Sequence, residues 1–232
     1  LGGIGTYVYA RRVLADQRAA LVSAVLYVLS PYLLTDTYER GAMSEGLAWG
    51  LLPWLVWSAH SLYRDKRRVY FLATAGMTAC FVLAHNITAF FILPAVVLYV
   101  LPLATIERRL GALWPVAGAF ALGLGLSAFY WLPALAELPF ARADQHMLSG
   151  ATDVRNNLIP LHQAIQPTLL HRYTGPLRFH FSLWQFVIGL VGVVGLILHR
   201  RGWRYALWLL AMGWLVVMLL QADFSLVFWE NL

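Results

Sequence analysis

The chain has 232 residues, of which 60% are hydrophobic and only 12% charged, and its formal net charge is +6. A soluble globular domain carries about 25% charged residues, so this chain has too few charges to cover a water-facing surface. The composition excludes an ordinary soluble domain and indicates an integral membrane protein. A positive net charge can also indicate nucleic-acid binding, but the positions of the basic residues favour a membrane topology and no nucleic acid.

Hydrophobic segments of membrane-spanning length follow one another along the chain. A spanning helix needs about 20 mostly apolar residues. Residues 1–10 are too short and are expected to be the last turns of a span that begins before Leu1. The predicted full spans are 19–34, 47–63, 69–84, 88–104, 112–135, 181–199 and 205–221. The sequence thus predicts an all-α, polytopic transmembrane helical bundle of about seven full spans and one truncated span, forming a single domain fragment over 1–232 that is expected to be cut at both ends.

Basic residues gather in alternate loops of this predicted topology. Loops on one side hold most of the 17 Lys and Arg, namely Arg11, Arg12, Arg18, Arg64, Lys66, Arg67, Arg68, Arg108, Arg109, Arg200, Arg201 and Arg204. Because Lys and Arg collect in cytoplasmic loops, these loops are expected inside and the intervening loops outside. Most of the 11 acidic residues fall on the expected outer side. Acidic residues contribute little to orientation, so topology alone does not explain this second bias. We therefore expect the candidate site on the outer face.

The first predicted outer loop concentrates charged residues between two helix breakers, Pro31 and Gly41. Its candidate substrate-binding residues are Asp36, Tyr38, Glu39 and Arg40, with Glu45 in the first turns of the next helix. An ionisable group at membrane depth is costly and commonly faces a bundle interior or a wet cavity. Near a helix N-terminus a carboxylate also gains about 0.3–1 kcal/mol from the helix dipole. Two interpretations of Glu45 stay open: a helix-terminal charge paired with Arg40, or a ligand-binding or catalytic carboxylate.

Other outer segments add further candidates. His85 and Asn86 form a short turn between two spans, where they either shape the turn or bind a substrate. Glu137 lies just past Pro133, which ends or kinks its span. The long outer loop 136–180 is expected to hold short amphipathic helices, and its histidines lack the i, i+4 spacing of a zinc site. No metal and no cofactor are therefore expected. Three glycines inside a span are expected to let helices pack closely: Gly118, Gly123 and Gly125.

Several short stretches, in their order and spacing, resemble a bacterial membrane-protein family known as the 6-pyruvoyl-tetrahydropterin synthase-related membrane-domain family. They are residues 24–27, 30–32, 38–42 with Glu45, 85–88, and 130–135 with Glu137. The resemblance covers nearly the whole chain and implies a multi-pass protein of the bacterial inner membrane. It does not imply the chemistry of the true synthases. Those are small soluble α/β enzymes with a three-histidine zinc site, which nothing in this sequence matches.

This family is in turn similar to the GT-C superfamily of membrane glycosyltransferases, which take a sugar from a polyprenyl-phosphate donor on the outer face of the membrane. The similarity implies a glycosyltransferase, or the remnant of one, whose partners are membrane lipid and a polyprenyl-phosphate-linked sugar. In GT-C enzymes the acid/base carboxylate lies in the first outer loop, which by the span count precedes Leu1, so the catalytic residue is unknown. Two other functions stay open: a transporter or flippase for a lipid-linked carrier, and a non-enzymatic membrane scaffold.

Overall fold

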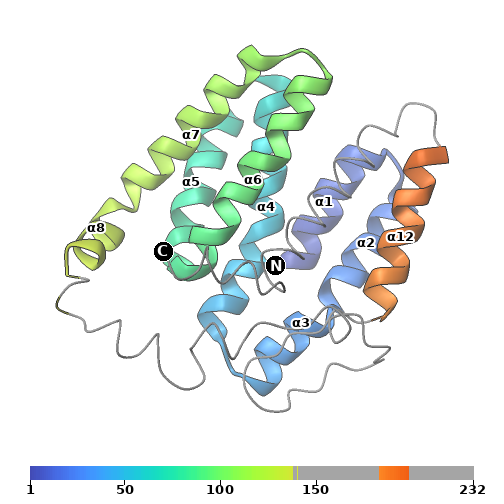
Figure 1. The fold of residues 1–232 in the computed structure, drawn as a ribbon, viewed down its shortest axis with the longest axis horizontal. Coiled ribbons are helices and arrows are strands. Elements are labelled where there is room, and N and C mark those ends of the chain that lie inside the picture. The colour runs from blue at the N-terminus through green and yellow to red at the C-terminus, as the bar shows by residue number, and fades with distance from the viewer. Residues whose placement is uncertain (138–139, 141–182, 199–232) are drawn as a thin grey trace, which may run out of the picture. The chain divides into compact units, whose positions relative to one another are not determined.

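The structure, a computed structural model, describes residues 1–137, 140 and 183–198. The regular elements of this part of the chain are all helical, so the predicted all-α class is confirmed there. They are α1 (Gly2–Leu14), α2 (Gln17–Val28), α3 (Pro31–Leu34), the π-helical turn η1 (Thr35–Glu39), α4 (Met43–Asp65), α5 (Arg68–Ala84), α6 (Asn86–Ile106), the 3₁₀ turn η2 (Leu110–Ala112), α7 (Leu113–Leu126), α8 (Ala128–Ala136) and α12 (Leu183–Leu198) (Figure 1).

The chain divides into two compact units, Leu1–Glu137 and Leu138–Leu232. The second unit contributes α12, an apolar helix that falls within the predicted span 181–199. The predicted span 205–221, and all of the predicted outer loop beyond Glu137 except Phe140, lie outside the described residues. The single domain predicted over 1–232 stays a prediction. The site described below belongs entirely to the first unit.

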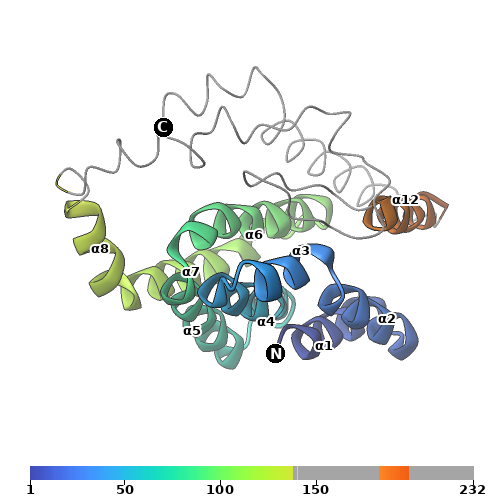
Figure 2. The ribbon, with the colours of Figure 1, turned by 90° about the horizontal axis from the view of Figure 1, so that it is seen from below.

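Helix α4 is the centre of the first unit. It packs against α1 and α5, while α2 packs on α1 and α7 packs on α5 (Figures 1 and 2). Its residues Leu55 and Tyr63 are fully buried, as is Phe81 of α5. In a bundle that faces lipid, the van der Waals packing of such side chains holds the helices together, because leaving water provides no driving force there.

One predicted glycine contact is confirmed. A Cβ atom built on Gly123 of α7 would lie 2.5 Å from Cβ of Thr78 and 2.6 Å from the Ala75 carbonyl oxygen of α5. Only a residue without a side chain therefore allows this approach of α7 to α5. Around Gly125 the same construction meets nothing within 4 Å, so that glycine makes no such contact in the described part of the chain.

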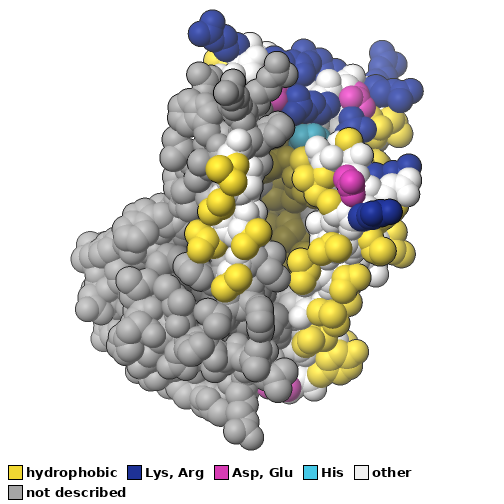
Figure 3. Space-filling model, turned by 90° about the vertical axis from the view of Figure 1, so that its right-hand side faces the viewer, with side chains coloured by type: hydrophobic (Ala, Val, Ile, Leu, Met, Phe, Trp, Pro, Cys, Tyr) yellow, Lys and Arg dark blue, Asp and Glu magenta, His cyan; other side chains and the backbone are white. Residues whose placement is uncertain are grey.

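The outside of the first unit is rich in exposed large hydrophobic side chains, among them Leu21, Leu72, Phe90 and Trp114. In Figure 3, hydrophobic side chains cover much of the described part of the visible surface, while Lys and Arg gather toward one end. Soluble monomers rarely expose contiguous apolar surface on this scale. The arrangement fits a helical bundle whose sides face lipid.

Among the described residues, α6 is the one helix both long and apolar enough to cross a membrane by itself. Two pairs of segments pass the same test only together. Gln17–Val28 is followed by Tyr32–Glu39 at a bend of 45°, and Leu110–Leu126 by Ala128–Ala136 at a bend of 68°. Counting each bent pair as one span gives up to three spans. The predicted spans 19–34 and 112–135 are therefore interrupted, and a total of seven stays a prediction.

The first unit has two chemically different ends. Where α1, α4 and α6 finish lies the basic end, which carries the described Lys and Arg residues apart from Arg40. Ion pairs join these helix ends, from Arg12 to Asp65 and from Arg64 to Glu107. The opposite end, where α4 and α6 begin, carries Arg40 and most of the predicted outer-face candidates. We call this the cluster end.

Candidate functional site

The candidate site lies where the chain turns from η1 into α4. The Arg40 N–H donates to the Thr35 carbonyl at 3.0 Å, a step of five residues that makes η1 wider than an α-helical turn. Such π-helical turns occur frequently at functional sites. Gly41 then adopts a φ of 64°, in the left-handed region that favours glycine. The turn places Arg40 opposite Glu45, in the first turn of α4.

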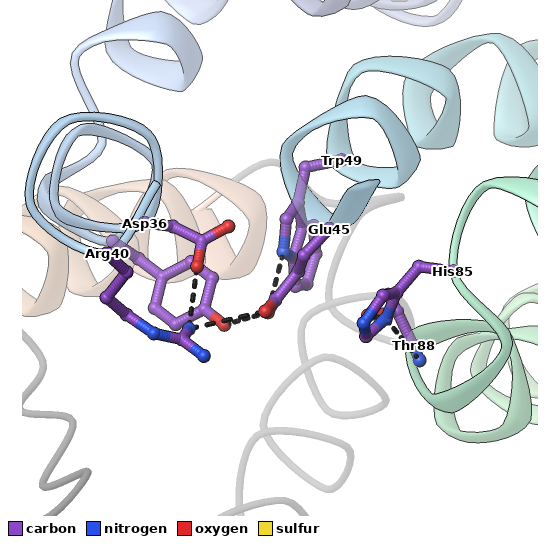
Figure 4. Close-up of polar contacts among 7 residues, drawn as sticks. Asp36, Arg40, Glu45, Trp49, His85 and Thr88 are labelled. Atoms are coloured by element: carbon purple, nitrogen blue, oxygen red, sulfur yellow. Dashed lines mark hydrogen bonds and ion pairs between the residues drawn. The ribbon is translucent and has the colours of Figure 1, made fainter. Parts of the chain in front are cut away.

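Three charged side chains meet here, and we call them the carboxylate cluster: Asp36, Arg40 and Glu45. The Arg40 Nη1 atom donates to Asp36 Oδ1 at 2.6 Å and to Glu45 Oε2 at 3.2 Å (Figure 4). The Asp36 side chain is only 1% exposed and that of Glu45 12%. The predicted pairing of Glu45 with Arg40 is thus confirmed. One guanidinium binds two carboxylates, so the cluster carries a net negative charge when both acids are ionised.

Two aromatic residues that the sequence analysis missed complete the cluster. The Tyr32 hydroxyl donates to Glu45 Oε1, and Trp49 Nε1 donates to the same oxygen at 3.5 Å. The two rings meet edge to face, with their centroids 5.6 Å apart. A sequence signal existed, because Tyr32 and Asp36, like Glu45 and Trp49, are four residues apart, the spacing that brings side chains together on one face of a helix.

Burial singles out Asp36 within the cluster, because its side chain is 1% exposed and lies in Tyr32–Glu39, the second segment of a possible bent span. Its Oδ2 atom is buried and has no hydrogen-bond partner among the described residues. Asp36 Oδ2 is therefore the acceptor in the cluster that is left for a proton or for a ligand donor.

His85 and Asn86 are engaged in the turn that begins α6. The His85 Nδ1 atom accepts the Thr88 N–H at 3.2 Å and lies 2.8 Å from the Thr88 hydroxyl, so His85 caps the helix. The Asn86 Oδ1 atom accepts the N–H of Ile87 at 2.9 Å. Figure 4 shows His85 and Thr88 bonded to each other rather than to the cluster. No hydrogen bond or ion pair joins these two predicted residues to the cluster in the described part of the chain.

The remaining predicted residues stand apart. Tyr38 is 81% exposed, and Glu39 and Glu137 are exposed as well. None of the three has an ion pair or side-chain hydrogen bond to another described residue. Of the eight predicted binding residues, the structure therefore brings together Asp36, Arg40 and Glu45. The roles of all eight as binding residues stay predictions.

A second polar network lies inside the bundle, nearer the basic end. The Tyr9 hydroxyl of α1 donates to the Tyr99 hydroxyl of α6 at 2.7 Å, and Nδ1 of His60 on α4 lies 2.8 Å from the same Tyr99 oxygen. His60 is buried. The network joins three helices through uncharged or weakly basic groups, in contrast to the charged cluster at the other end.

The comparison with known families decides the affiliation of the chain. The family model described as "6-pyruvoyl-tetrahydropterin synthase related domain; membrane protein" matches residues 1–232. The chain belongs to this family. The predicted resemblance is confirmed over the whole length of this member of the 6-pyruvoyl-tetrahydropterin synthase related family, and with it the location in a membrane. No curated protein and no solved structure matches the chain.

Proposed function

We propose that this family member is a multi-pass protein of the bacterial inner membrane that acts as a GT-C-like glycosyltransferase, using a polyprenyl-phosphate-linked sugar on the outer face. The observation that carries the proposal is the carboxylate cluster, in which two acids, one guanidinium and two aromatic side chains meet at the end of a membrane helix bundle. Ionisable groups buried at membrane depth are costly, and each is by default a candidate for a functional site.

The charge of the cluster suits a ligand rich in hydroxyl groups better than a bare phosphate. Arg40 already binds Asp36 and Glu45, and an added phosphate would compete with both carboxylates for its donors. A sugar hydroxyl, in contrast, donates to a carboxylate oxygen without introducing charge. Asp36 Oδ2 is a buried acceptor with no partner among the described residues. We therefore assign Asp36 to the contact with a sugar hydroxyl of the acceptor.

In the proposed reaction, the bond between the anomeric carbon and the phosphate oxygen of the donor breaks, and a bond from that carbon to the acceptor hydroxyl oxygen forms. The acceptor proton passes to a carboxylate, and the polyprenyl phosphate leaves with the bonding electron pair. The cluster supports positioning of the acceptor hydroxyl by Asp36 and Glu45, while the carboxylate that takes the proton stays unassigned.

The test measures transfer of radiolabelled sugar from undecaprenyl phosphate to endogenous acceptors, in membranes carrying the full-length protein. Asp36→Asn, Glu45→Gln and Arg40→Ala are expected to abolish transfer. Asp16→Asn is the control, because it removes one carboxylate at the opposite end of the bundle and keeps a side-chain oxygen to cap α2. Wild-type transfer by the cluster variants, or equal loss in the Asp16 variant, would contradict the proposed site.

A transporter or flippase for a lipid-linked carrier is the second candidate, because of the bent helices. The breaks of 45° after α2 and 68° after α7 are of the kind found in secondary transporters, where discontinuous helices line the binding site. Movement of a fluorescent polyprenyl phosphate across proteoliposomes, without any sugar acceptor, would support this function. Its absence together with sugar transfer in membranes would favour the enzyme.

A further inference from the structure

The groove between α1 and α2 is a separate feature, on the lipid-facing side of the bundle and away from the carboxylate cluster. It is an open groove with a volume of about 570 Å³. Its apolar wall consists of Gly3, Ile4, Tyr7, Leu21 and Ala24. Ile4 is 64% exposed and Leu21 58%, so the groove opens on the outside of the helix pair rather than into the core.

One end of this apolar groove is cationic. Arg18 and Gln17, in the first turn of α2, line it directly. Arg11 lies in the last turn of α1 and follows Ile4 and Tyr7 at helical spacing, so it continues the same face of α1 by one turn. Both arginines are exposed and have no ion pair with another described residue. The groove therefore combines a long apolar wall with a pair of guanidinium groups at one end.

No nearby acid forms an ion pair with either arginine in the described part of the chain. The Asp16 carboxylate accepts the N–H of Ala19 at 2.7 Å and caps α2. Asp65 binds Arg12 at 2.7 Å, and Glu107 binds Arg64 at 2.8 Å. At the basic end, each described acid is thus engaged within the protein. The positive charge of Arg11 and Arg18 is left for a partner.

The basic end is also the end at which the bilayer headgroups are expected to lie. Trp114, 79% exposed at the start of α7, lies at the basic end together with the exposed Leu110. Amphipathic aromatic residues of this kind concentrate at the membrane–water interface. Arg11 and Arg18 are thus placed where lipid phosphates lie, and the apolar wall runs from them toward the bilayer interior.

We propose that the groove between α1 and α2 binds an anionic phospholipid, with one acyl chain along Ile4, Tyr7 and Leu21 and the phosphate held by Arg11 and Arg18. Guanidinium groups bind phosphate oxygens in pairs of parallel hydrogen bonds. Basic pockets between membrane helices are known sites for acidic lipid headgroups. This site is independent of the proposed sugar transfer, because it lies at the other end of the bundle.

The experiment uses the full chain in detergent, with phosphatidylglycerol and phosphatidylcholine as probes and native mass spectrometry as the readout. Phosphatidylglycerol is expected to bind more tightly than the zwitterionic lipid. A basic residue near a charged membrane surface contributes an amount equivalent to about a fivefold change in affinity. The double variant Arg11→Gln with Arg18→Gln is therefore expected to weaken binding about 25-fold. The control Arg67→Gln with Arg68→Gln removes the same charge from the start of α5 and is expected to change binding less than about threefold.

A second pair of variants tests the acyl-chain part of the groove. Leu21→Trp fills the groove and is expected to reduce phosphatidylglycerol binding, whereas Val22→Trp, an equally exposed neighbour outside the lining, is expected to leave it unchanged. Excess inorganic phosphate is expected not to displace the lipid. Equal binding of the two lipids, equal weakening by both arginine pairs, wild-type binding by Leu21→Trp, or displacement by free phosphate would each overturn the proposal.

Discussion

The two ends of the helical bundle differ in how far their charged side chains are buried. At the cluster end, a single guanidinium binds two carboxylates, and the Asp36 side chain is only 1% exposed. At the basic end, Asp65 and Glu107 each bind one arginine, and further exposed cations surround them. The end with fewer charges therefore buries them, and the end with more charges leaves them in contact with water or lipid headgroups.

The number of charged side chains at an end therefore does not indicate how much they contribute to the free energy of unfolding. Removing one partner of a buried ion pair leaves an uncompensated charge and costs about 3–5 kcal/mol. Exposed pairs are screened, and double-mutant cycles on them typically give about 0.2–1 kcal/mol. We therefore expect the stability of the protein to depend strongly on Arg40 and weakly on the numerous arginines of the basic end. The predictions below test that expectation.

The largest effect is expected for Arg40→Ala. The variant leaves Asp36 and Glu45 facing each other without their cation, and the free energy of unfolding is expected to fall by about 3 kcal/mol. Denaturant unfolding in detergent, followed by Trp fluorescence, measures the loss. The control Arg64→Ala removes an arginine whose side chain is 37% exposed and is expected to cost less than about 1 kcal/mol.

A rescue variant sharpens this first prediction. Adding Asp36→Asn and Glu45→Gln to Arg40→Ala removes the unpaired negative charge and is expected to restore most of the lost stability. The side-chain amide introduced by Glu45→Gln keeps an oxygen for the Tyr32 and Trp49 donors. Equal losses for Arg40→Ala and Arg64→Ala, or no rescue, would show that the two ends do not differ in the way proposed.

The second prediction concerns close helix packing toward the cluster end. Gly123→Ala, near the end of α7, is expected to destabilise the protein. The added Cβ would meet Thr78 Cβ at 2.5 Å and a backbone oxygen at 2.6 Å. Inserting an atom into a packed contact costs about 1–3 kcal/mol. Gly125→Ala, with nothing within 4 Å, is the matched control and is expected to be neutral or slightly stabilising. Equal effects of the two substitutions would contradict the α5–α7 contact.

Sequence predicted these helices where the apolar pattern and the local breaks agree. The predicted spans 47–63, 69–84 and 88–104 match α4, α5 and α6 within a few residues, because charged or turn residues bound each apolar run. The predicted span 112–135 is instead bent by 68° at Ser127. The apolar composition is continuous across the bend, so a hydrophobic count does not detect it. The Ser127 hydroxyl donates to the Gly123 and Leu124 carbonyls, each at 3.1 Å, and such side-chain bonds often bend helices.

The sequence likewise predicted only part of the candidate site. Charge and position indicated Asp36, Arg40 and Glu45. Tyr32 and Trp49 were missed, because aromatic residues are frequent in this chain and most of them only face lipid or the core. The capping role of His85 depends on the backbone geometry of one turn, in which its side chain accepts the Thr88 N–H. A role in shaping the turn was one of the two interpretations of His85 that the sequence left open.

The third prediction concerns the buried network nearer the basic end. Tyr99→Phe removes the hydroxyl shared by Tyr9 and His60 and leaves both partners short of one hydrogen bond. The free energy of unfolding is expected to fall by about 1–2 kcal/mol, the cost of leaving buried polar groups unsatisfied. Tyr70→Phe is the control, because its ring contacts Arg12 and Trp57 while its hydroxyl has no hydrogen bond to another described residue. A neutral Tyr99→Phe would show that the network contributes nothing to the stability of this end.

The smallest effect is expected for the exposed pair of Arg12 and Asp65. A double-mutant cycle with Arg12→Gln and Asp65→Asn is expected to give a coupling of about 0.2–1 kcal/mol, because both side chains are roughly one-third exposed. The coupling is also expected to shrink as the salt concentration rises to about 1 M, because screening shortens the range of the interaction. The same cycle on Arg40 and Asp36 is expected to give a larger coupling that salt changes little. If both couplings are small and equally sensitive to salt, burial does not distinguish the two ends, and the carboxylate cluster loses the energetic feature that marks it as a site.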